Sequence, residues 1–172
     1  GRRGAGCREG TIMSSLIREN DVRSGPDRYI SEPGIAADIG RFLSDYRHPV
    51  IVTGTHSWHA FAGYATNVPD YPVFRYDGSA TKRNAKELAG AISADQADAI
   101  VAIGAGKLSD TAKNIAELLG IDLIMVPTLA ATCAAYSPLS VNYDEDHRYE
   151  SALLHHRNSN LVLVDAALIA TG

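Results

Sequence analysis

The segment GAGKLSDTAK at residues 104–113 has the composition of a loop that holds phosphate groups. It lies between a wholly apolar run, residues 99–103, and a stretch whose apolar side chains recur at helical spacing. Glycines let the backbone approach a pyrophosphate closely, and the free N–H groups at the start of a helix attract anions. However, Ser109 stands where the dinucleotide fingerprint has its third glycine, and Leu108 follows the lysine where a Walker A loop has Ser or Thr. The spacing therefore leaves two interpretations open, a phosphate-binding loop and an ordinary strand-to-helix turn.

The six histidines of the sequence suggest no catalytic base and no metal centre. His56 and His59 stand three residues apart on an expected helix, and we interpret them as a solvent-facing pair because no third ligand lies nearby. His155 and His156 are adjacent on an expected strand, where neighbouring side chains point to opposite faces and cannot chelate one ion. The two remaining histidines, His48 and His147, fall in expected turns.

The two cysteines, Cys7 and Cys133, are far apart and lack the CxxC spacing of a zinc or redox motif. We expect free thiols in a reducing cytoplasm rather than a disulfide scaffold. No histidine partner for Cys133 is suggested by the sequence, so we interpret it as a small packed thiol and not as a nucleophile.

Composition excludes several classes of protein. The chain has 172 residues, of which 45% are hydrophobic and 21% charged, as in one ordinary globular domain and unlike a disordered chain. No apolar run reaches the roughly 18 residues of a membrane span. The net charge is −4, and since residues 1–13 carry +2, the remainder carries −6. A domain this acidic is a poor candidate for binding nucleic acid.

From residue 34 onward the pattern alternates between apolar runs and helical spacing, with short connections. This order is typical of an α/β fold with a doubly wound, mostly parallel sheet. Ser109 is expected to cap the helix that ends at Gly120. The strands are expected at residues 50–53, 73–76, 99–103 and 123–126, and the other helices at 35–43, 58–65 and 82–94.

The pattern changes after Thr128. Residues 139–143 and 149–154 flank the polar segment 144–148 and predict a β-hairpin excursion from the sheet. Residues 161–165 predict a final strand with no helix behind it. We expect residues 1–14, rich in glycine and arginine, to be a tail outside the fold, and residues 15–172 to form one domain.

Three segments in order, GAGKLSDTAK, VPTLAATCAAYSPLSVNY and LVLVD, carry a family resemblance. Over residues 20–172 the sequence resembles the iron-containing (metal-dependent) alcohol dehydrogenase superfamily, on its glycerol dehydrogenase and hydroxycarboxylate dehydrogenase branch. The resemblance implies a dehydroquinate synthase-like N-terminal domain that binds NAD or NADP. A helical domain that holds a divalent metal, Zn or Fe, would follow that domain.

The resemblance also assigns residues to the cofactor site. It implies that Gly104, Ala105, Gly106 and Lys107 cradle the pyrophosphate, with Asp110 in the same site. Thr128 would lie by the adenosine half of the cofactor, which agrees with its place after a strand. The residues on the nicotinamide side would be Ser137, Leu139 and Tyr143.

The sequence departs from the family in three places. Gly54 replaces the acidic residue that glycerol dehydrogenases have after the first strand, so tolerance of NADP(H) is expected. Cys133 replaces an aspartate near the substrate, which favours a 2-hydroxy acid over glycerol. The metal ligands, one Asp and two His, would lie beyond Gly172, so we expect the helical domain to be absent and the chain to contain no metal ligands.

The function implied by the resemblance is hydride transfer between NAD(P) and a secondary alcohol or 2-hydroxy acid, with the metal as a Lewis acid. Two alternatives stay open, a non-catalytic nucleotide-binding module and a truncated remnant without turnover. We expect a small alcohol or hydroxy acid as partner, no nucleic acid and no membrane. Self-association is expected through an apolar face at the C-terminal strand.

Overall fold

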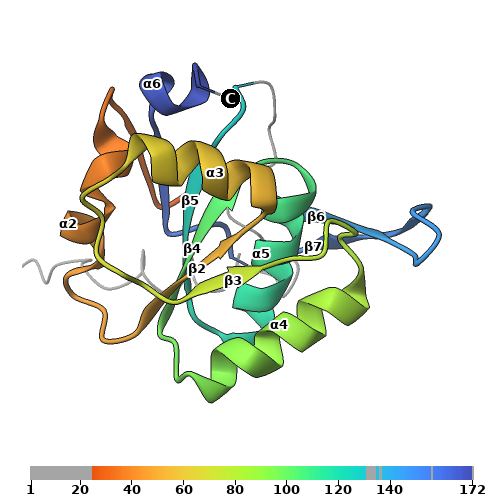
Figure 1. Cartoon of the computed structure of the whole chain (residues 1–172). Helices are drawn as coiled ribbons and strands as arrows, with labels where there is room; N and C mark the ends of the chain where they lie inside the picture. Colours follow the sequence, from red (N-terminus) through yellow and green to blue (C-terminus); the bar gives the residue numbers. More distant parts are fainter. Residues whose placement is uncertain (1–24, 131–134, 136, 156, 172) are drawn as a thin grey trace, which may run out of the picture.

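The structure is a computed structural model that describes residues 25–130, 135, 137–155 and 157–171. Strands and helices alternate through the first two thirds of the chain, as the apolar periodicity predicts (Figure 1). The elements are β1 (Arg28–Ser31), the 3-10 turn η1 (Ile35–Asp38), α2 (Ile39–Leu43), β2 (Pro49–Thr53), α3 (Thr55–Tyr64), β3 (Val73–Arg75), α4 (Lys82–Ala94), β4 (Ala99–Gly104), α5 (Lys107–Leu119), β5 (Asp122–Pro127), β6 (Leu139–Tyr143), β7 (Tyr149–Leu154), β8 (Leu161–Val164) and α6 (Ala166–Ile169).

Six of the strands form one sheet in the order β1-β8-β5-β4-β2-β3, and all of its pairings are parallel. The central strands are apolar along their length because both faces of the sheet are covered. After β3 the chain crosses back over β2 to form β4, so the direction of winding reverses between β2 and β4. The predicted α/β fold with a doubly wound parallel sheet is therefore confirmed.

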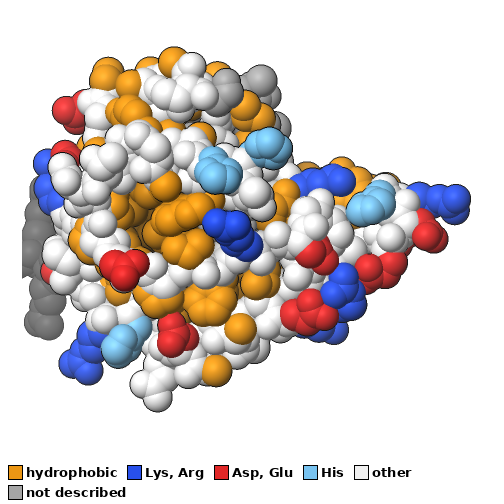
Figure 2. Space-filling model, in the orientation of Figure 1, with side chains coloured by type: hydrophobic (Ala, Val, Ile, Leu, Met, Phe, Trp, Pro, Cys, Tyr) orange, Lys and Arg blue, Asp and Glu red, His pale blue; other side chains and the backbone are white. Residues whose placement is uncertain are grey.

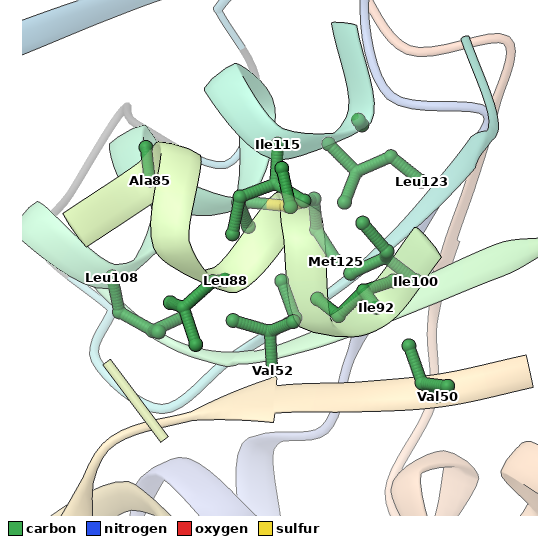
Figure 3. Packing of buried hydrophobic residues seen from close by; sticks show 14 of the residues in the cluster. Val50, Val52, Ala85, Leu88, Ile92, Ile100, Leu108, Ile115, Leu123 and Met125 are labelled. Atoms are coloured by element: carbon green, nitrogen blue, oxygen red, sulfur yellow. The ribbon is translucent and has the colours of Figure 1, made fainter. Parts of the chain in front are cut away.

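Alternate residues of each central strand enter two separate cores. Val50 and Val52 of β2 pack with α4 and α5, and the same cluster contains Ile100 of β4 (Figure 3). Ile51 of β2 and Val101 of β4 enter the second core, which η1, α2, α3 and α6 cover. The two cores fix the register of the sheet, since a shift by one residue would exchange the faces.

Helices α4 and α5 cover the core that contains Val50 and Val52. Capping residues explain where α4 begins and where α5 ends. The side chain of Thr81 accepts a hydrogen bond from the N–H of Asn84, 3.1 Å away, and so caps α4. Helix α4 has the predicted bounds, 82–94, and its buried residues Ala85, Leu88, Ala89 and Ile92 recur at helical spacing. Gly120 ends α5, as predicted, and its N–H reaches the carbonyls of Ala116 and Glu117.

Strands β6 and β7 pair antiparallel and form the predicted hairpin, with the predicted bounds. The hairpin lies outside the main sheet and projects to the right in Figure 1. Its tip, residues 144–148, carries charged side chains of both signs together with His147 (Figure 2). Arg83 of α4 donates to Glu145 at 2.7 Å, which ties the tip back to the body of the domain.

Four expectations about this part of the molecule are wrong. Ser109 does not cap α5, because the helix already begins at Lys107 after Gly106. A short helix, α6, does follow the final strand, and the Asp165 side chain caps it by accepting from two of its N–H groups. His155 lies just after β7 rather than on it. Strand β1, near the start of the described residues, is a separate omission, because no strand was predicted there.

The fourth error concerns the apolar face expected at the C-terminal strand. Strand β8 lies between β5 and β1, and Val162 and Leu163 are fully buried. Apart from Leu129, which follows β5, the exposed large apolar side chains described in this half of the chain lie instead on α5, β6 and β7, at Leu118, Leu139, Tyr149, Leu153 and Leu154. Among the described residues, no helix has the length and apolar character needed to cross a membrane.

Candidate dinucleotide site

Three of the predicted site residues follow neighbouring strands at one edge of the sheet. Gly54 follows β2, Gly104 ends β4 and Thr128 follows β5. The N–H of Thr128 donates to the carbonyl of Gly104 at 3.2 Å, which joins two of them directly. In doubly wound sheets, ligands bind outside the carboxyl ends of the strands where the winding reverses. The structure therefore brings these residues to the edge at which such a fold binds a ligand.

The loop between β4 and α5 needs its glycines. Gly104 has φ +153, and a Cβ at this position would lie 2.8 Å from Cγ of Leu108. Gly106, with φ +54, adopts a backbone conformation that L side chains rarely enter. These two residues fold the chain tightly against the start of α5. In the first helical turn, the N–H of Leu108 donates to the carbonyl of Ala105 at 3.2 Å and the N–H of Asp110 donates to the carbonyl of Gly106 at 3.1 Å. The positive end of the helix dipole still favours an anion at this loop.

Two polar side chains are buried in the first turn of α5. The Oγ of Ser109 is fully buried and makes no hydrogen bond in the part of the chain that the structure describes. Asp110 is 9% exposed. Burial raises the pKa of its carboxyl from the ordinary 3.8 to about 6, although the charge of Lys113 and the N–H of Val141 lower it. A buried hydroxyl without a partner and an acid that is hard to ionise are both unusual in an ordinary turn.

Lys107, the first residue of α5, is fixed by the hairpin. Its Nζ lies 4.6 Å from the centre of the Tyr143 ring on β6, a cation–π contact. The N–H of Tyr143 donates to the carbonyl of Ala80 at 3.2 Å, so the ring is itself held by the backbone ahead of α4. The structure thus places Tyr143 beside the lysine that follows the glycines and orders that cation. The predicted contact of Tyr143 with a nicotinamide ring stays a prediction.

The other two residues predicted for the nicotinamide side are Leu139, which contacts α5 beyond its first turn, and Ser137, which precedes β6. The carbonyl of Leu139 accepts from Nζ of Lys113 at 2.9 Å, one turn after Asp110, while the Leu139 side chain is 41% exposed. Ser137 is partly exposed, and no hydrogen bond joins it to the glycine loop within the described residues. Their predicted contact with a nicotinamide ring stays a prediction.

Gly54 is closely packed rather than open. A Cβ built on it would lie 2.9 Å from Cε1 of Tyr76, the residue that follows β3. The N–H of Tyr76 donates to the carbonyl of Thr53 at 3.0 Å, which holds the ring beside the end of β2. Any side chain at position 54 would therefore displace this aromatic ring.

Some predicted residues cannot be placed, and others do not join the site. Cys133, predicted to lie near the substrate, falls outside the described residues. His56 and His59 are both exposed on α3, as their interpretation as a solvent-facing pair requires. Within the described ranges, no three His, Cys, Asp or Glu side chains are placed to hold a metal ion. The metal that the sequence resemblance implies therefore has no ligand set among these residues.

Two features of the site escaped the sequence analysis. The contact of Tyr76 with Gly54 joins residues that follow two different strands and depends on the parallel pairing of β2 with β3. A second feature is the polar face of α5, where Asp110, Lys113 and Asn114 are all buried beneath the hairpin. These three polar residues recur at helical spacing in a segment that also has an apolar stripe. That pattern could have predicted that two faces of this helix are covered.

Comparison with known proteins identifies the family of this chain. Residues 26–166 match the family described as iron-containing alcohol dehydrogenase. The chain is 35% identical over 129 residues to hydroxycarboxylate dehydrogenase A of Escherichia coli K12, covering 70% of this chain and 34% of that protein. It is 29% identical over 156 residues to the glycerol dehydrogenase of Escherichia coli O6:H1, covering 87% of this chain and 42% of that protein.

A solved structure has the same fold. The probable glycerol dehydrogenase from Sinorhizobium meliloti 1021 superposes with a TM-score of 0.77 at 28% identity, covering 86% of this chain and 42% of that one. The chain thus spans less than half the length of these relatives. Because the family match covers the sheet, the glycine loop and the hairpin together, this chain belongs to the iron-containing alcohol dehydrogenase family.

Proposed function

We propose that this chain is the dinucleotide-binding part of an NAD(P)-dependent oxidoreductase that acts on a secondary alcohol or 2-hydroxy acid. The observation that carries the proposal is the start of α5, where two glycines in demanding conformations precede an ordered lysine and a buried hydroxyl without a partner. These features suit a diphosphate, because they supply backbone N–H donors and a positive charge at one edge of the sheet.

A bound nicotinamide cofactor would supply the hydride acceptor or donor. The residues of this chain would bind and orient it. The backbone of residues 104–107 would hold the diphosphate, and Lys107 would balance part of its charge. Asp110, when protonated, can donate a hydrogen bond to the cofactor without adding a negative charge next to the phosphates. We further propose that the protein works in the cytoplasm, since its two cysteines are not spaced as a disulfide framework.

Titration of the chain with NADH, followed by nicotinamide fluorescence, tests this proposal. We expect saturable binding that Lys107→Met weakens about tenfold, because one charge-assisted contact to phosphate is lost. Lys86→Met is the matched control, since Lys86 is exposed on α4. If NADH does not bind the native chain, or if both variants bind as the native chain does, the proposed function is wrong.

The substrate class forms the second part of the proposal. The relative that is 35% identical is named for hydroxycarboxylates, and position 133 holds a cysteine, which does not repel an anionic substrate as an aspartate would. The test uses the whole protein that contains this chain, comparing kcat/KM for 2-hydroxy acids with kcat/KM for glycerol. A higher value for glycerol contradicts the proposal. Cys133→Asp should shift the ratio toward glycerol.

The alternative function is that of a nucleotide-binding module without turnover. The described residues supply groups that suit a dinucleotide, but they do not supply ligands for the family's metal. The two candidates differ in one measurement on the whole protein. Formation of NAD(P)H that depends on both the alcohol and an added divalent metal supports the oxidoreductase, and cofactor binding without any such turnover supports the module.

A further inference from the structure

The histidine at the base of the hairpin is enclosed by groups from both sides. His155 is 3% exposed. Its Nδ1 contacts a carboxylate oxygen of Glu117 on α5, and its Nε2 lies 2.5 Å from Oγ of Ser140 on β6. The N–H of His155 donates to the carbonyl of Pro138 at 2.7 Å, so the backbone is fixed as well. Both ring nitrogens are therefore engaged by polar atoms in a nearly dry environment.

The hydrogen atoms available to these groups determine the protonation state of the ring. The Ser140 hydroxyl, which has one hydrogen, donates to the carbonyl of Asp110 at 3.2 Å. A carbonyl can only accept, so Oγ has to accept from Nε2–H of His155. The Glu117 side chain is 36% exposed, so its carboxylate contacts water. An ionised carboxylate also only accepts, so Nδ1 carries a hydrogen too.

We infer that His155 is held as an imidazolium between Glu117 and Ser140, and that it is a positioning residue for the start of α5. Contacts between polar groups lead from Glu117 through His155 and Ser140 to Asp110. They connect the third turn of α5, by way of β6, to the first turn of the same helix. It fixes β6 along the helix, and β6 carries Tyr143, the ring beside Lys107. Loss of the His155 proton would leave one ring nitrogen without a hydrogen facing an acceptor oxygen, or would turn the Ser140 hydroxyl toward the ring and leave the carbonyl of Asp110 without that donor.

The charged groups around His155 have opposing effects on its proton. Glu117 on α5 favours the imidazolium. Lys113 on the same helix and Arg157 after the hairpin line the same cavity, of about 290 Å³, and oppose it. The carboxyl of Asp110, when ionised, favours the imidazolium and partly balances the charge of Lys113. The direct contact with Glu117 is the closest of these interactions, so it decides the state of the ring.

Nitrogen chemical shifts of the imidazole rings measure this state directly in the full chain. We expect both nitrogens of His155 to be protonated at about pH 8, above the ordinary imidazole value. Its signals are assigned by their absence in His155→Gln. In Glu117→Gln the ring should become neutral at that pH, whereas Glu87→Gln, on exposed α4, should leave it charged. A neutral His155 at about pH 8 in the native chain overturns the inference.

The effect on cofactor binding rests on the proposed function and is measured separately. In the native chain, we expect NADH affinity to fall about tenfold as pH rises through the deprotonation of His155. In Glu117→Gln, we expect NADH affinity to be weak already and not to change over that pH range. An affinity that follows pH equally in native chain and Glu117→Gln would show that His155 does not position the site. If NADH does not bind at all, the proposed function fails while the nitrogen shifts still decide the state of His155.

Discussion

Nζ of Lys107 lies 4.6 Å above the ring of Tyr143, which joins the first residue of α5 to the hairpin across 36 positions of sequence. The lysine follows the two glycines whose conformations shape the loop, so its charge is ordered before any ligand binds. Ordering a long side chain in advance lowers the entropic cost of binding. The hairpin, although outside the main sheet, is therefore part of the candidate dinucleotide site.

The first prediction follows from this contact. Tyr143→Leu should weaken NADH binding about threefold, because a cation–π contact at a partly exposed site contributes roughly 0.5–1 kcal/mol. Tyr143→Phe keeps an aromatic face and should bind nearly as the native chain does. Fluorescence titration measures both. Tyr149→Leu, on the 66% exposed tyrosine of β7, controls for a general effect on the hairpin. Equal losses in the leucine variants would contradict the role given to Tyr143.

The second prediction concerns the pH dependence of stability at Asp110. Its folded-state pKa of about 6 lies above the ordinary 3.8, so the folded protein holds this proton more tightly than the unfolded chain does. The stabilisation is complete below the ordinary value and is lost as pH rises through about 6. Asn resembles the protonated acid, so Asp110→Asn should be more stable than the native chain by about 2 kcal/mol at pH near 8.

Urea unfolding near pH 4 and near pH 8 measures this difference. The advantage of Asp110→Asn should be small at the lower pH and full at the higher one. An advantage that is equal at both would show that Asp110 is not the titrating group. The same ionisation brings a negative charge to the proposed phosphate site, so NADH affinity should also decline as pH rises through about 6 in the native chain and not in Asp110→Asn.

The third prediction concerns Asp165, whose pKa is lowered where that of Asp110 is raised. Burial raises the pKa of this carboxyl, but N–H groups at Gly34, Ala36 and Leu168 and the hydroxyl of Tyr64 outweigh it and hold the pKa below the ordinary range. Its contribution to stability is present above the unfolded pKa and is lost as pH falls through the lowered value. Asp165→Asn should therefore reduce the free energy of unfolding at neutral pH by about 2–4 kcal/mol.

Thermal and urea unfolding at neutral pH test this expectation. Asp38→Asn is the control, because Asp38 is exposed at the neighbouring turn and makes no such set of contacts in the described part of the chain. Tyr64→Phe removes only the hydroxyl, 2.9 Å from Oδ2 of Asp165, and should cost about 1 kcal/mol. A fully stable Asp165→Asn would mean that the charge itself is not needed.

The fourth prediction separates charge from shape at Gly54. We expect the native chain to bind NADPH no more than about tenfold more weakly than NADH, since position 54 has no carboxylate to repel a 2′-phosphate. Gly54→Ala and Gly54→Asp both press on the Tyr76 ring and should both lose stability. Only Gly54→Asp should also weaken NADPH relative to NADH. A similar change of preference in the alanine variant would contradict the electrostatic reason.

The main sheet could be predicted because its strands are buried on both faces. Residues 99–103 are wholly apolar, and α4 has both a threonine cap and a regular apolar stripe. The edge strand β1 is mostly exposed, with a sequence pattern that differs little from a loop. The short helix α6 depends on Asp165, whose cap becomes evident only when its N–H partners are in place.

The site could be predicted in part. The residues of the glycine loop are contiguous, so their spacing alone places them together at a strand-to-helix turn. The packing of Tyr76 on Gly54 and the contacts of His155 with Ser140 and Glu117 join segments far apart in sequence. Local periodicity contains no information on such contacts, because they depend on how the hairpin lies along α5.

The central claim is that the edge formed by the loop before α5 binds a dinucleotide, and amide chemical-shift mapping during NADH titration tests it most directly. We expect the largest changes at Gly106, Lys107 and Leu108, with smaller ones at Thr128 and Gly54. Changes confined to residues 157–160, which line the cavity at the other end of α5, would contradict the account. So would an unchanged spectrum at saturating NADH.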